Sequence, residues 1–418
     1  MTDLACPPAP ASVSATPRRR GLPAPLTLLV AANAVSLIGN VVMTVAIPWL
    51  VLTTTGSAAL AGIAVFAGAG SALVGGLAAG RVVDAIGPIR TSAAADLLSG
   101  VAVVPLPVLL ALDALEILHV VLLAALGTLA DSAGSTARQS LVPVAADWVG
   151  FPRERANALF TSAEHVGYLV GAPLAGVLIA AFGVSGALWV TVSAFAFAAL
   201  VVARFVDVPR RRVATPSAGP GLRETIAFIW ADPALRALVV FPTAAVFLVG
   251  PLTPIVLPVL AREAFGDPVA LGVMVASYGA GGLLGAAGFG VLGTRMPRRW
   301  LYRAVFVVWP ATYAAMTLSP SLPVTLAMLL TLGIAAGALV PLQATIRQQR
   351  APEYLLPRVV GLSTATIPVV APIGVLVTGF LLDGVGLHTT LVVMSTGAGL
   401  IGASVLANRR IRAFDATI

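Results

Sequence analysis

The sequence GGLAAGRVVDAIGPIR, residues 75–90, interrupts a long apolar run with a compact polar stretch. Two arginines and one aspartate stand between glycines, so the chain returns to water here after one passage through an apolar solvent. Ahead of these charges, Gly76 and Gly80 form a small-xxx-small pair. Such a pair lets the backbones of two transmembrane helices approach each other closely. The stretch therefore predicts a tight connection between two packed membrane helices.

The composition of the whole chain is that of a membrane protein. Of its 418 residues, 58% are hydrophobic and 10% are charged, and the mean hydropathy is +0.99. Runs of ~20 apolar residues recur along the chain, each long enough to cross ~30 Å of hydrocarbon. Barrel strands would instead alternate polar and apolar residues over ~10 positions, and these runs do not. We therefore expect an all-α membrane protein, a bundle whose backbone hydrogen bonds are satisfied within each helix.

The apolar runs predict twelve transmembrane helices in two six-helix halves. The expected domains are a disordered cytoplasmic tail (1–24), a first half (25–205), a central cytoplasmic linker with an interfacial helix over 222–230 (206–232), a second half (233–408) and a second cytoplasmic tail (409–418). A cleaved signal peptide is the alternative for the tail, but the following apolar run is too long for its core segment. The expected spans are Leu26–Leu52, Ala58–Ala79, 92–112, 117–137, 158–182, 185–204, 235–260, 270–292, 301–318, 324–344, 359–382 and 388–408, with a polar connection over 138–157.

The arginines sort to one side of the membrane under this assignment. The chain has no lysine, and 24 of its 25 arginines fall in segments predicted to be cytoplasmic, which leaves only Arg262 outside. Cytoplasmic loops carry such an excess of basic residues, so we expect a multi-pass protein of the bacterial inner membrane with both termini in the cytoplasm. The net charge of +8 then reflects topology, and no nucleic-acid partner is expected.

Several classes of chemistry lack the residues that they need. Without lysine the chain has neither a Walker A phosphate loop nor a Schiff-base nucleophile. Cys6 is the single cysteine and forms no intrachain disulfide, and the three histidines are scattered. We therefore expect no enzyme activity, no cofactor and no metal site.

The two halves resemble each other in sequence. A shift of 210 residues places Gly62 on Gly272 and Gly75 on Gly285, and a shift of 209 places Arg138-Gln139 on Arg347-Gln348. Residues 175–183 match 378–386 at a shift of 203. A parallel repeat of six helices is one of the known architectures of membrane transporters. We expect the two halves to be related by a pseudo-twofold axis.

The opening stretch resembles the signature between helices 2 and 3 of the major facilitator superfamily. Gly80, Asp84, Gly87 and Arg90 occupy the places of the glycine, the aspartate, the second glycine and the arginine of that signature. In proteins that it resembles, this gating loop latches the two halves together on the cytoplasmic side and loosens as the transporter changes state. The alternative is that the charges only solvate a cytoplasmic loop. The second half has Thr294 where Asp84 would align, so one latch is expected.

The fifth expected helix resembles the antiporter motif of the same superfamily. Gly167, Gly171, Pro173 and Gly176 carry the resemblance, although Ala172 separates the glycine from the proline. The motif implies export by antiport, and ordinary close packing is the alternative. Residues 136–143, 155–159 and 222–236 resemble the macrolide-efflux and enterobactin-exporter-like branch of drug:proton antiporters.

Carboxylates inside predicted spans are costly in lipid and are usually functional. Asp96, Asp131 and Glu164 fall in such spans, and His165 adjoins Glu164. A desolvated carboxylate can bind and release a proton as its surroundings change, so these four residues are candidates for proton coupling. The alternative is static pairing with Arg81, Arg90 or Arg138.

The resemblance implies a central cavity lined by helices 1, 4, 7 and 10. Helix 1 presents a polar stripe at helical spacing, which lines a pocket or makes hydrogen bonds between helices: Asn33, Ser36, Asn40 and Thr44. Helix 7 contributes Phe241 and Phe247, and four prolines that are expected to break it: Pro242, Pro251, Pro254 and Pro258. An apolar wall with a few dipoles suits an uncharged or amphipathic organic molecule.

These patterns together predict a secondary transporter that exports a hydrophobic or amphipathic small molecule, a drug, antibiotic or secondary metabolite, in exchange for protons. A monomer that uses alternating access is expected. Two alternatives remain, the proton-linked or facilitated uptake of a small organic nutrient and a membrane scaffold that transports nothing.

Overall fold

The structure is a computed structural model, and it describes residues 24–206, 222–292, 296–318, 321–352, 355–408 and 414. The segments 1–23 and 207–221, and most of 409–418, lie outside this description. The described residues form helices and no strands. The elements are α1 (Ala24–Thr55), α2 (Ala58–Ile86), α3 (Pro88–Val103), α4 (Pro105–Ala111), α5 (Ile117–Trp148), α6 (Arg153–Phe205), α7 (Leu222–Ala231), α8 (Pro233–Val249), η1 (Leu252–Val256), α9 (Leu257–Leu260), η2 (Ala261–Phe265), α10 (Pro268–Leu292), α11 (Arg298–Leu318), α12 (Leu322–Arg350), α13 (Leu356–Thr364) and α14 (Ile367–Ala407).

Nine helical spans in the described part are long and apolar enough to cross a membrane. Two of them, 51 and 50 residues long, are each divided by a glycine with a positive φ, Gly183 at 68° and Gly386 at 79°. Side chains rarely adopt this conformation, so glycine allows α6 and α14 each to turn between two helices. Divided in this way, and with the less apolar α11 added, the helices agree with the expected twelve.

The connection in the opening stretch is a single residue. Gly87 has φ 88°, and its N–H donates to the carbonyl oxygen of Val83 at 2.8 Å. Asp84 therefore lies in the last turn of α2 and Arg90 in the first turn of α3. A side chain at position 87 would be strained, which explains the glycine.

The expected polar connection over 138–157 is wrong in the structure. Helix α5 continues to Trp148, α6 begins at Arg153, and Arg138 is buried inside α5. Asp96 on α3 lies 2.8 Å from Arg138 and neutralises its charge inside the bundle. The expected break of the seventh span at its four prolines is also wrong, since Pro233–Phe265 is one continuous helical span, in which π-helical turns follow Pro251.

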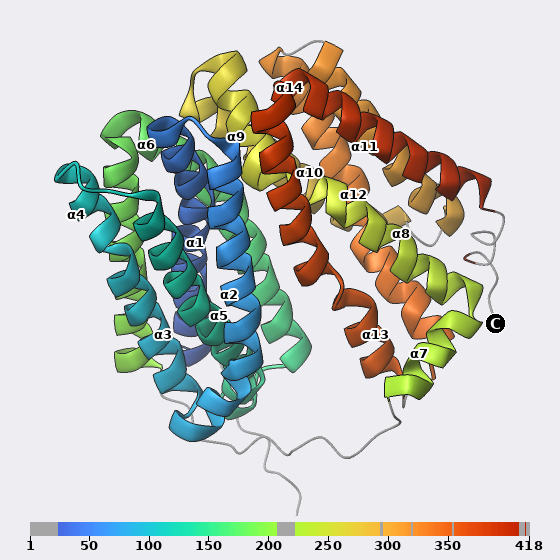
Figure 1. Cartoon of the computed structure of the whole chain (residues 1–418). Coiled ribbons are helices and arrows are strands. Elements are labelled where there is room, and N and C mark those ends of the chain that lie inside the picture. Colours follow the sequence, from blue (N-terminus) through green and yellow to red (C-terminus); the bar gives the residue numbers. More distant parts are fainter. Residues whose placement is uncertain are drawn as a thin grey trace, which may run out of the picture.

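The helices form two bundles that meet along two pairs of helices, α6 with α10 and α2 with α14 (Figure 1). A Cβ atom on Gly176 would lie 3.3 Å from the Cα atom of Gly272, and one on Gly62 would lie 3.6 Å from that of Gly379. The sequence repeat places Gly62 on Gly272 and Gly176 on Gly379. The two contacts between the halves are therefore pseudo-symmetric copies of each other.

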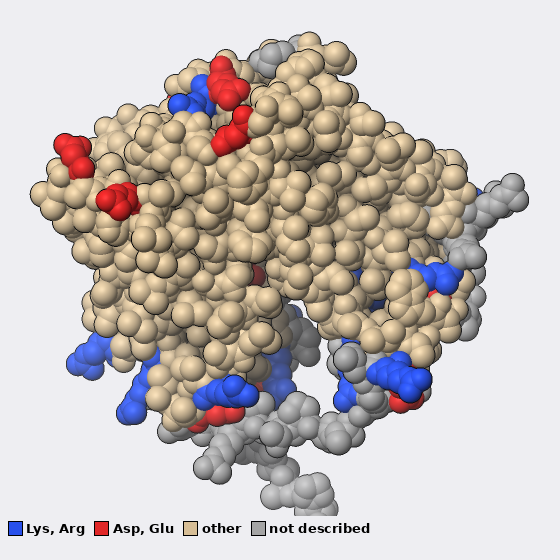
Figure 2. Space-filling view, in the orientation of Figure 1, with Lys and Arg blue, Asp and Glu red and all other residues tan. Residues whose placement is uncertain are grey.

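The two bundles diverge away from these contacts. In Figure 1, α2 and α14 lie close at one end and separate toward the end that carries α7 and α13. Figure 2 shows most of the visible arginines at that same end, where the surface is hollowed between the bundles. The molecule is thus a wedge that is closed at one end and open at the arginine-rich end.

Close helix packing within each half also depends on glycine, and this can be measured. We expect Gly285→Ala to lower the stability by about 1–3 kcal/mol, because the new Cβ would overlap the carbonyl oxygen of Ile334 in α12. Gly288→Ala is the matched control, since a Cβ there meets nothing within 4 Å. The measurement is thermal unfolding in detergent, and equal unfolding midpoints for the two variants would contradict the packing argument.

Candidate functional site

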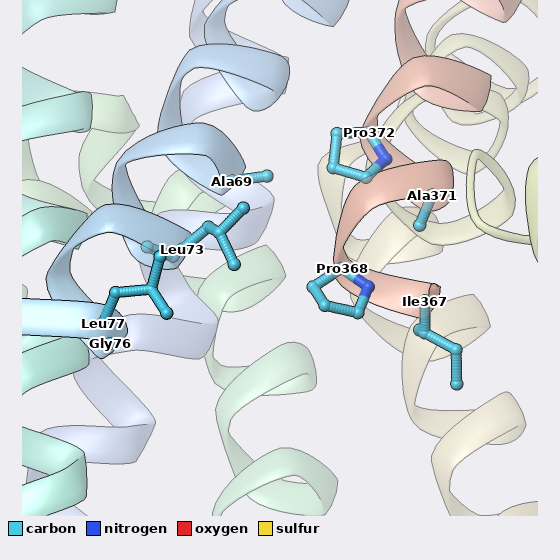
Figure 3. A pocket seen from close by; sticks show the side chains of 9 residues that line it. Ala69, Leu73, Gly76, Leu77, Ile367, Pro368, Ala371 and Pro372 are labelled. Atoms are coloured by element: carbon cyan, nitrogen blue, oxygen red, sulfur yellow. The ribbon is translucent and has the colours of Figure 1, made fainter. Parts of the chain in front are cut away.

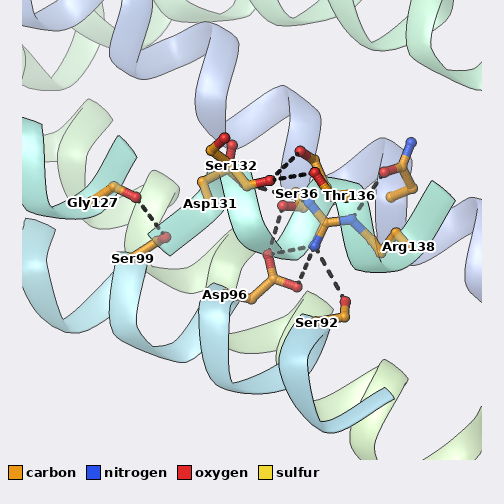
Figure 4. Close-up of polar contacts among 11 residues, drawn as sticks. Ser36, Ser92, Asp96, Ser99, Gly127, Asp131, Ser132, Thr136 and Arg138 are labelled. Carbon is orange, nitrogen blue, oxygen red and sulfur yellow. Dashed lines mark hydrogen bonds and ion pairs between the residues drawn. The ribbon is translucent and has the colours of Figure 1, made fainter. Parts of the chain in front are cut away.

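A buried ion pair joins α3 and α5 in the first half (Figure 4). Arg138 is 2% exposed and Asp96 is fully buried, and Nη1 of the arginine lies 2.8 Å from both carboxylate oxygens. The hydroxyl of Ser36, on α1, donates to the same carboxylate at 2.8 Å. Charges removed from water are stable only when such partners satisfy them. Asp96 is therefore held by charged and polar donors from two other helices.

The remaining donors of Arg138 reach two more groups. Its Nε donates to the amide oxygen of Asn33 at 3.0 Å, and Nη2 lies 3.4 Å from a carboxylate oxygen of Asp131. One guanidinium thus faces two carboxylates, which leaves the cluster with one negative charge when both are ionised. The arginine binds α1, α3 and α5 together.

Asp131 differs from Asp96 in its exposure. Its side chain is 19% exposed, and its contact with Arg138 is single and long. It also lines a cavity of about 320 Å³, whereas Asp96 does not. Of the two carboxylates that contact Arg138, Asp131 is the one that water or a ligand can reach.

The cavity lies between α1, α2 and α5 and has a mixed wall. Asn40, Thr44, Thr128 and Asp131 supply its polar groups, and Pro254 joins it from the second half. The amide of Asn40 has no protein partner among the described residues. The rest of the wall is apolar, with side chains that include Met43, Ile47, Val65 and Phe195. An apolar cavity with a few convergent polar groups is typical of a small-molecule site.

The structure divides the polar stripe of helix 1. Asn40 and Thr44 line the cavity, whereas Asn33 and Ser36 are buried in the charge network and make hydrogen bonds between helices. The two candidate phenylalanines of the seventh expected span lie on α8 and do not line this cavity. Phe241 packs edge-on against Phe306 at 6.4 Å between ring centroids, and the backbone of Phe247 contacts Gly374 of α14.

The antiporter-like motif packs α6 on two neighbours. A Cβ on Gly167 or Gly171 would come within 2.9 Å of Leu37 or Val41 of α1. Farther along the helix, a Cβ on Gly176 would lie 2.7 Å from the carbonyl oxygen of Pro268 in α10, and Pro173 contacts the same helix. The motif therefore joins the first half both to its own α1 and to the second half.

Glu164 precedes the first glycine of this motif by about one turn and is half-buried. Helix α6 runs parallel to α1 here, so Glu164 lies at the level of Asn33. The side chain of His165 lies outside the described part of the structure.

The gating loop faces the open end of the wedge. Gly80, Asp84 and Arg90 are exposed, and Gly87 is buried. Among the described residues, Asp84 makes no hydrogen bond or ion pair.

Sequence reasoning missed Asp383, which joins the halves at the closed end. Its carboxylate accepts hydrogen bonds from the backbone N–H groups of Ala58 at 2.7 Å and Ala59 at 3.1 Å, and from the hydroxyl of Ser57. These groups form the N-terminus of α2, which favours a negative charge. The available signal was an acidic residue directly after the expected span 359–382. It lies at the membrane face where the expected span Ala58–Ala79 begins.

The sequence profile described as Major Facilitator Superfamily matches residues 29–256 and 243–413. The chain belongs to this superfamily. Among its relatives, the protein named multidrug efflux pump Tap from Mycolicibacterium fortuitum is 33% identical over 94% of this chain and 97% of its own length. The protein of the same name from Mycobacterium tuberculosis (strain ATCC 25618 / H37Rv) is 31% identical over 94% and 95%.

Solved structures agree with the superfamily fold. The nucleoside transporter NupG has a TM-score of 0.75 at 11% identity, and the comparison covers 92% of this chain and 98% of that one. A bacterial homologue of the human lysosomal transporter Spinster, in an inward-facing and unoccupied conformation, has a TM-score of 0.66 at 16% identity and 94% coverage of both chains.

This superfamily member carries its buried acidic groups asymmetrically. Arg347 is the sequence counterpart of Arg138 and is 6% exposed, but its Nη2 donates to the neutral amide of Gln343 at 3.0 Å. The shift of 210 places Phe306 where the first half has Asp96. The described residues contain no group of three metal-ligating side chains.

The buried pair predicts a large loss of stability when one partner is removed. We expect Arg138→Gln to cost about 3–5 kcal/mol, because Asp96 would stay buried without its counter-charge. The double variant with Asp96→Asn should recover part of that loss. Arg153→Gln is the matched control, since its pair with Asp147 is exposed and should contribute about 1 kcal/mol or less. Chemical unfolding in detergent measures all three, and a similar loss for both arginines would contradict the argument.

Proposed function

We propose that the protein is a secondary active transporter that exports a hydrophobic or amphipathic small molecule by alternating access. The observation that carries this proposal is a cavity in the first half that Pro254 of the second half helps to line, in a molecule whose two pseudo-symmetric halves are closed at one end and separated at the other. The multidrug efflux pumps that the chain resembles over 94% of its length support the direction of transport. Rocking of the halves would expose the cavity to each side in turn.

The arginine distribution gives the orientation in the bilayer. Because cytoplasmic loops are rich in arginine, the open end of the wedge faces the cytoplasm and the closed end faces outward. In the proposed orientation both termini are cytoplasmic and the conformation is inward-facing. In it Asp84 is unpaired within the described residues, as expected for a gating-loop latch that has been released.

The structure supports different roles for the carboxylates in proton coupling. Asp96 is locked by two arginine contacts and a serine, so we assign it to holding α1, α3 and α5 together. Asp131 faces the cavity and has a single long contact, so it can exchange a proton without unfolding the network. Protonation of Asp131 would also remove the excess negative charge of the cluster.

Proton antiport can be tested with the purified protein in vesicles. We expect efflux of a fluorescent amphipathic dye to accelerate when the pH gradient is applied, and Asp131→Asn to lose this acceleration while it still exchanges dye without a gradient. Asp147→Asn is the matched control, because that carboxylate is exposed and lies outside the cavity. If efflux by the parent protein is independent of the pH gradient, proton antiport is contradicted and the export function remains. Accumulation in place of efflux would favour nutrient uptake.

Asp383 is proposed as the latch of the outward end. The shift of 210 pairs Ser57 with Asp267, and Asp267 caps α10 within its own half, with Val269 N–H donating at 2.8 Å. Helix α2 has no such acid of its own and takes its negative charge from Asp383 across the halves. Breaking this contact is therefore one cost of reaching the outward-facing state.

This role predicts a shift in conformation. We expect Asp383→Asn to increase the outward-open population several-fold, because the charged hydrogen bonds exist only in the inward-facing state. Asp267→Asn, the control, should change the population little. Spin labels at Thr55 and His388 report the opening by their distance distribution. An unchanged distribution in Asp383→Asn would assign the contact to helix capping alone.

A further inference from the structure

A second pocket opens sideways between the two halves (Figure 3). It has a volume of about 460 Å³ and lies between α2 and α14, where these helices begin to separate. Leu73 and Leu77 line it from α2, and Pro368 and Pro372 line it from α14. Nearer the closed end, the same two helices touch at Gly62 and Gly379. The pocket is thus the first widening of the wedge on this side.

The lining of the pocket suits lipid rather than water. All of its lining residues are alanine, glycine, leucine, isoleucine or proline. Leu73 and Leu77 lie within an apolar span and are 38% and 76% exposed. A surface of this kind at membrane depth is solvated by hydrocarbon chains, because it offers water no hydrogen-bonding partner.

The pocket adjoins the polar cavity. The side chain of Ala69 lines both, and its neighbour Gly68 lines the cavity side without a side chain. Beyond this small-residue wall stand the hydroxyl of Thr128 and the carboxylate of Asp131. An amphipathic molecule in the pocket would therefore have these polar groups on the far side of a wall that carries no large side chain.

We infer that the pocket between α2 and α14 is a lateral access and binding site, through which an amphipathic substrate dissolved in the inner leaflet reaches the cavity. This inference rests on the proposed export function and names the route of its substrate. The occupant is the substrate rather than a phospholipid, because the polar groups next to the pocket, on Thr128 and Asp131, lie inside the protein. The negatively charged cluster there would also repel a lipid phosphate.

The route would exist in one conformation only. The contacts of Gly62 and Asp383 close the outward end of the same helix pair. When the halves rock about the cavity, the arginine-rich end must close as these contacts part, and α2 then approaches α14 at the pocket. A substrate released outward could not return to the inner leaflet by this path.

Photo-crosslinking tests the occupant without requiring transport. Leu73 is replaced by p-benzoylphenylalanine in the full chain, reconstituted in phospholipid vesicles with rhodamine 6G, an amphipathic cation that suits the negative cluster. Val74, 59% exposed and outside the pocket, receives the same replacement as the control. We expect a rhodamine adduct at position 73 at least tenfold above position 74 by mass spectrometry. Phospholipid adducts alone, or equal rhodamine adducts at both positions, would overturn the inference.

Transport tests the route. Leu73→Trp fills the pocket and should lower kcat/KM for rhodamine 6G efflux about tenfold or more, whereas Val74→Trp should stay within about twofold of the parent. Efflux by Leu73→Trp equal to that of the parent would overturn the route. A rhodamine adduct at position 73 in a protein that expels no dye would instead retain the site and reject the export function, so the two failures are distinguishable.

Discussion

A guanidinium buried among apolar helices must find its counter-charge within the protein, because lipid offers none. Arg138 meets this constraint with Asp96, and its other donors reach Asn33 and Asp131. One side chain thereby fixes the mutual positions of α1, α3 and α5. A second carboxylate, Asp131, contacts the same guanidinium and lies at the wall of the cavity. The structural core of the first half and its exchangeable acid are two parts of one network.

The contacts between the halves follow a different principle. Lipid provides no hydrophobic force between helices, so close approach depends on small residues. The pseudo-symmetric glycine contacts at Gly62 and Gly176 supply this approach on both sides of the wedge. Charge then breaks the symmetry, since α2 is capped from the opposite half by Asp383, whereas α10 is capped by Asp267 of its own half. The glycine contact between the halves occurs on both sides of the wedge, whereas the acidic contact of Asp383 occurs on one side.

Depth and helix contact separate residues that look alike in sequence. Asn33 and Asn40 lie on the same polar stripe, but the first is buried against Arg138 and the second faces the cavity. Asp96 and Asp131 both sit in apolar spans, and only the neighbouring α1 and α5 decide which is locked and which is exposed. Hydropathy measures how apolar a segment is, but it does not tell which helix packs against that segment. For this reason Arg138 was expected in a connection, and its burial followed only from the position of Asp96.

The sequence by itself determined the helical class, the positions of most spans, the polar connection after the second span and the repeat that relates the halves. These follow from local physics, because a backbone in lipid must satisfy its own hydrogen bonds and charged residues remain in water. The structure shortened that connection to Gly87 alone. Only the tertiary structure decided that Asp383 caps α2, that Asn40 and Asp131 share a cavity, and that an apolar pocket adjoins it. Each of these joins residues far apart in the chain, and the helix crossings that bring them together leave no local pattern.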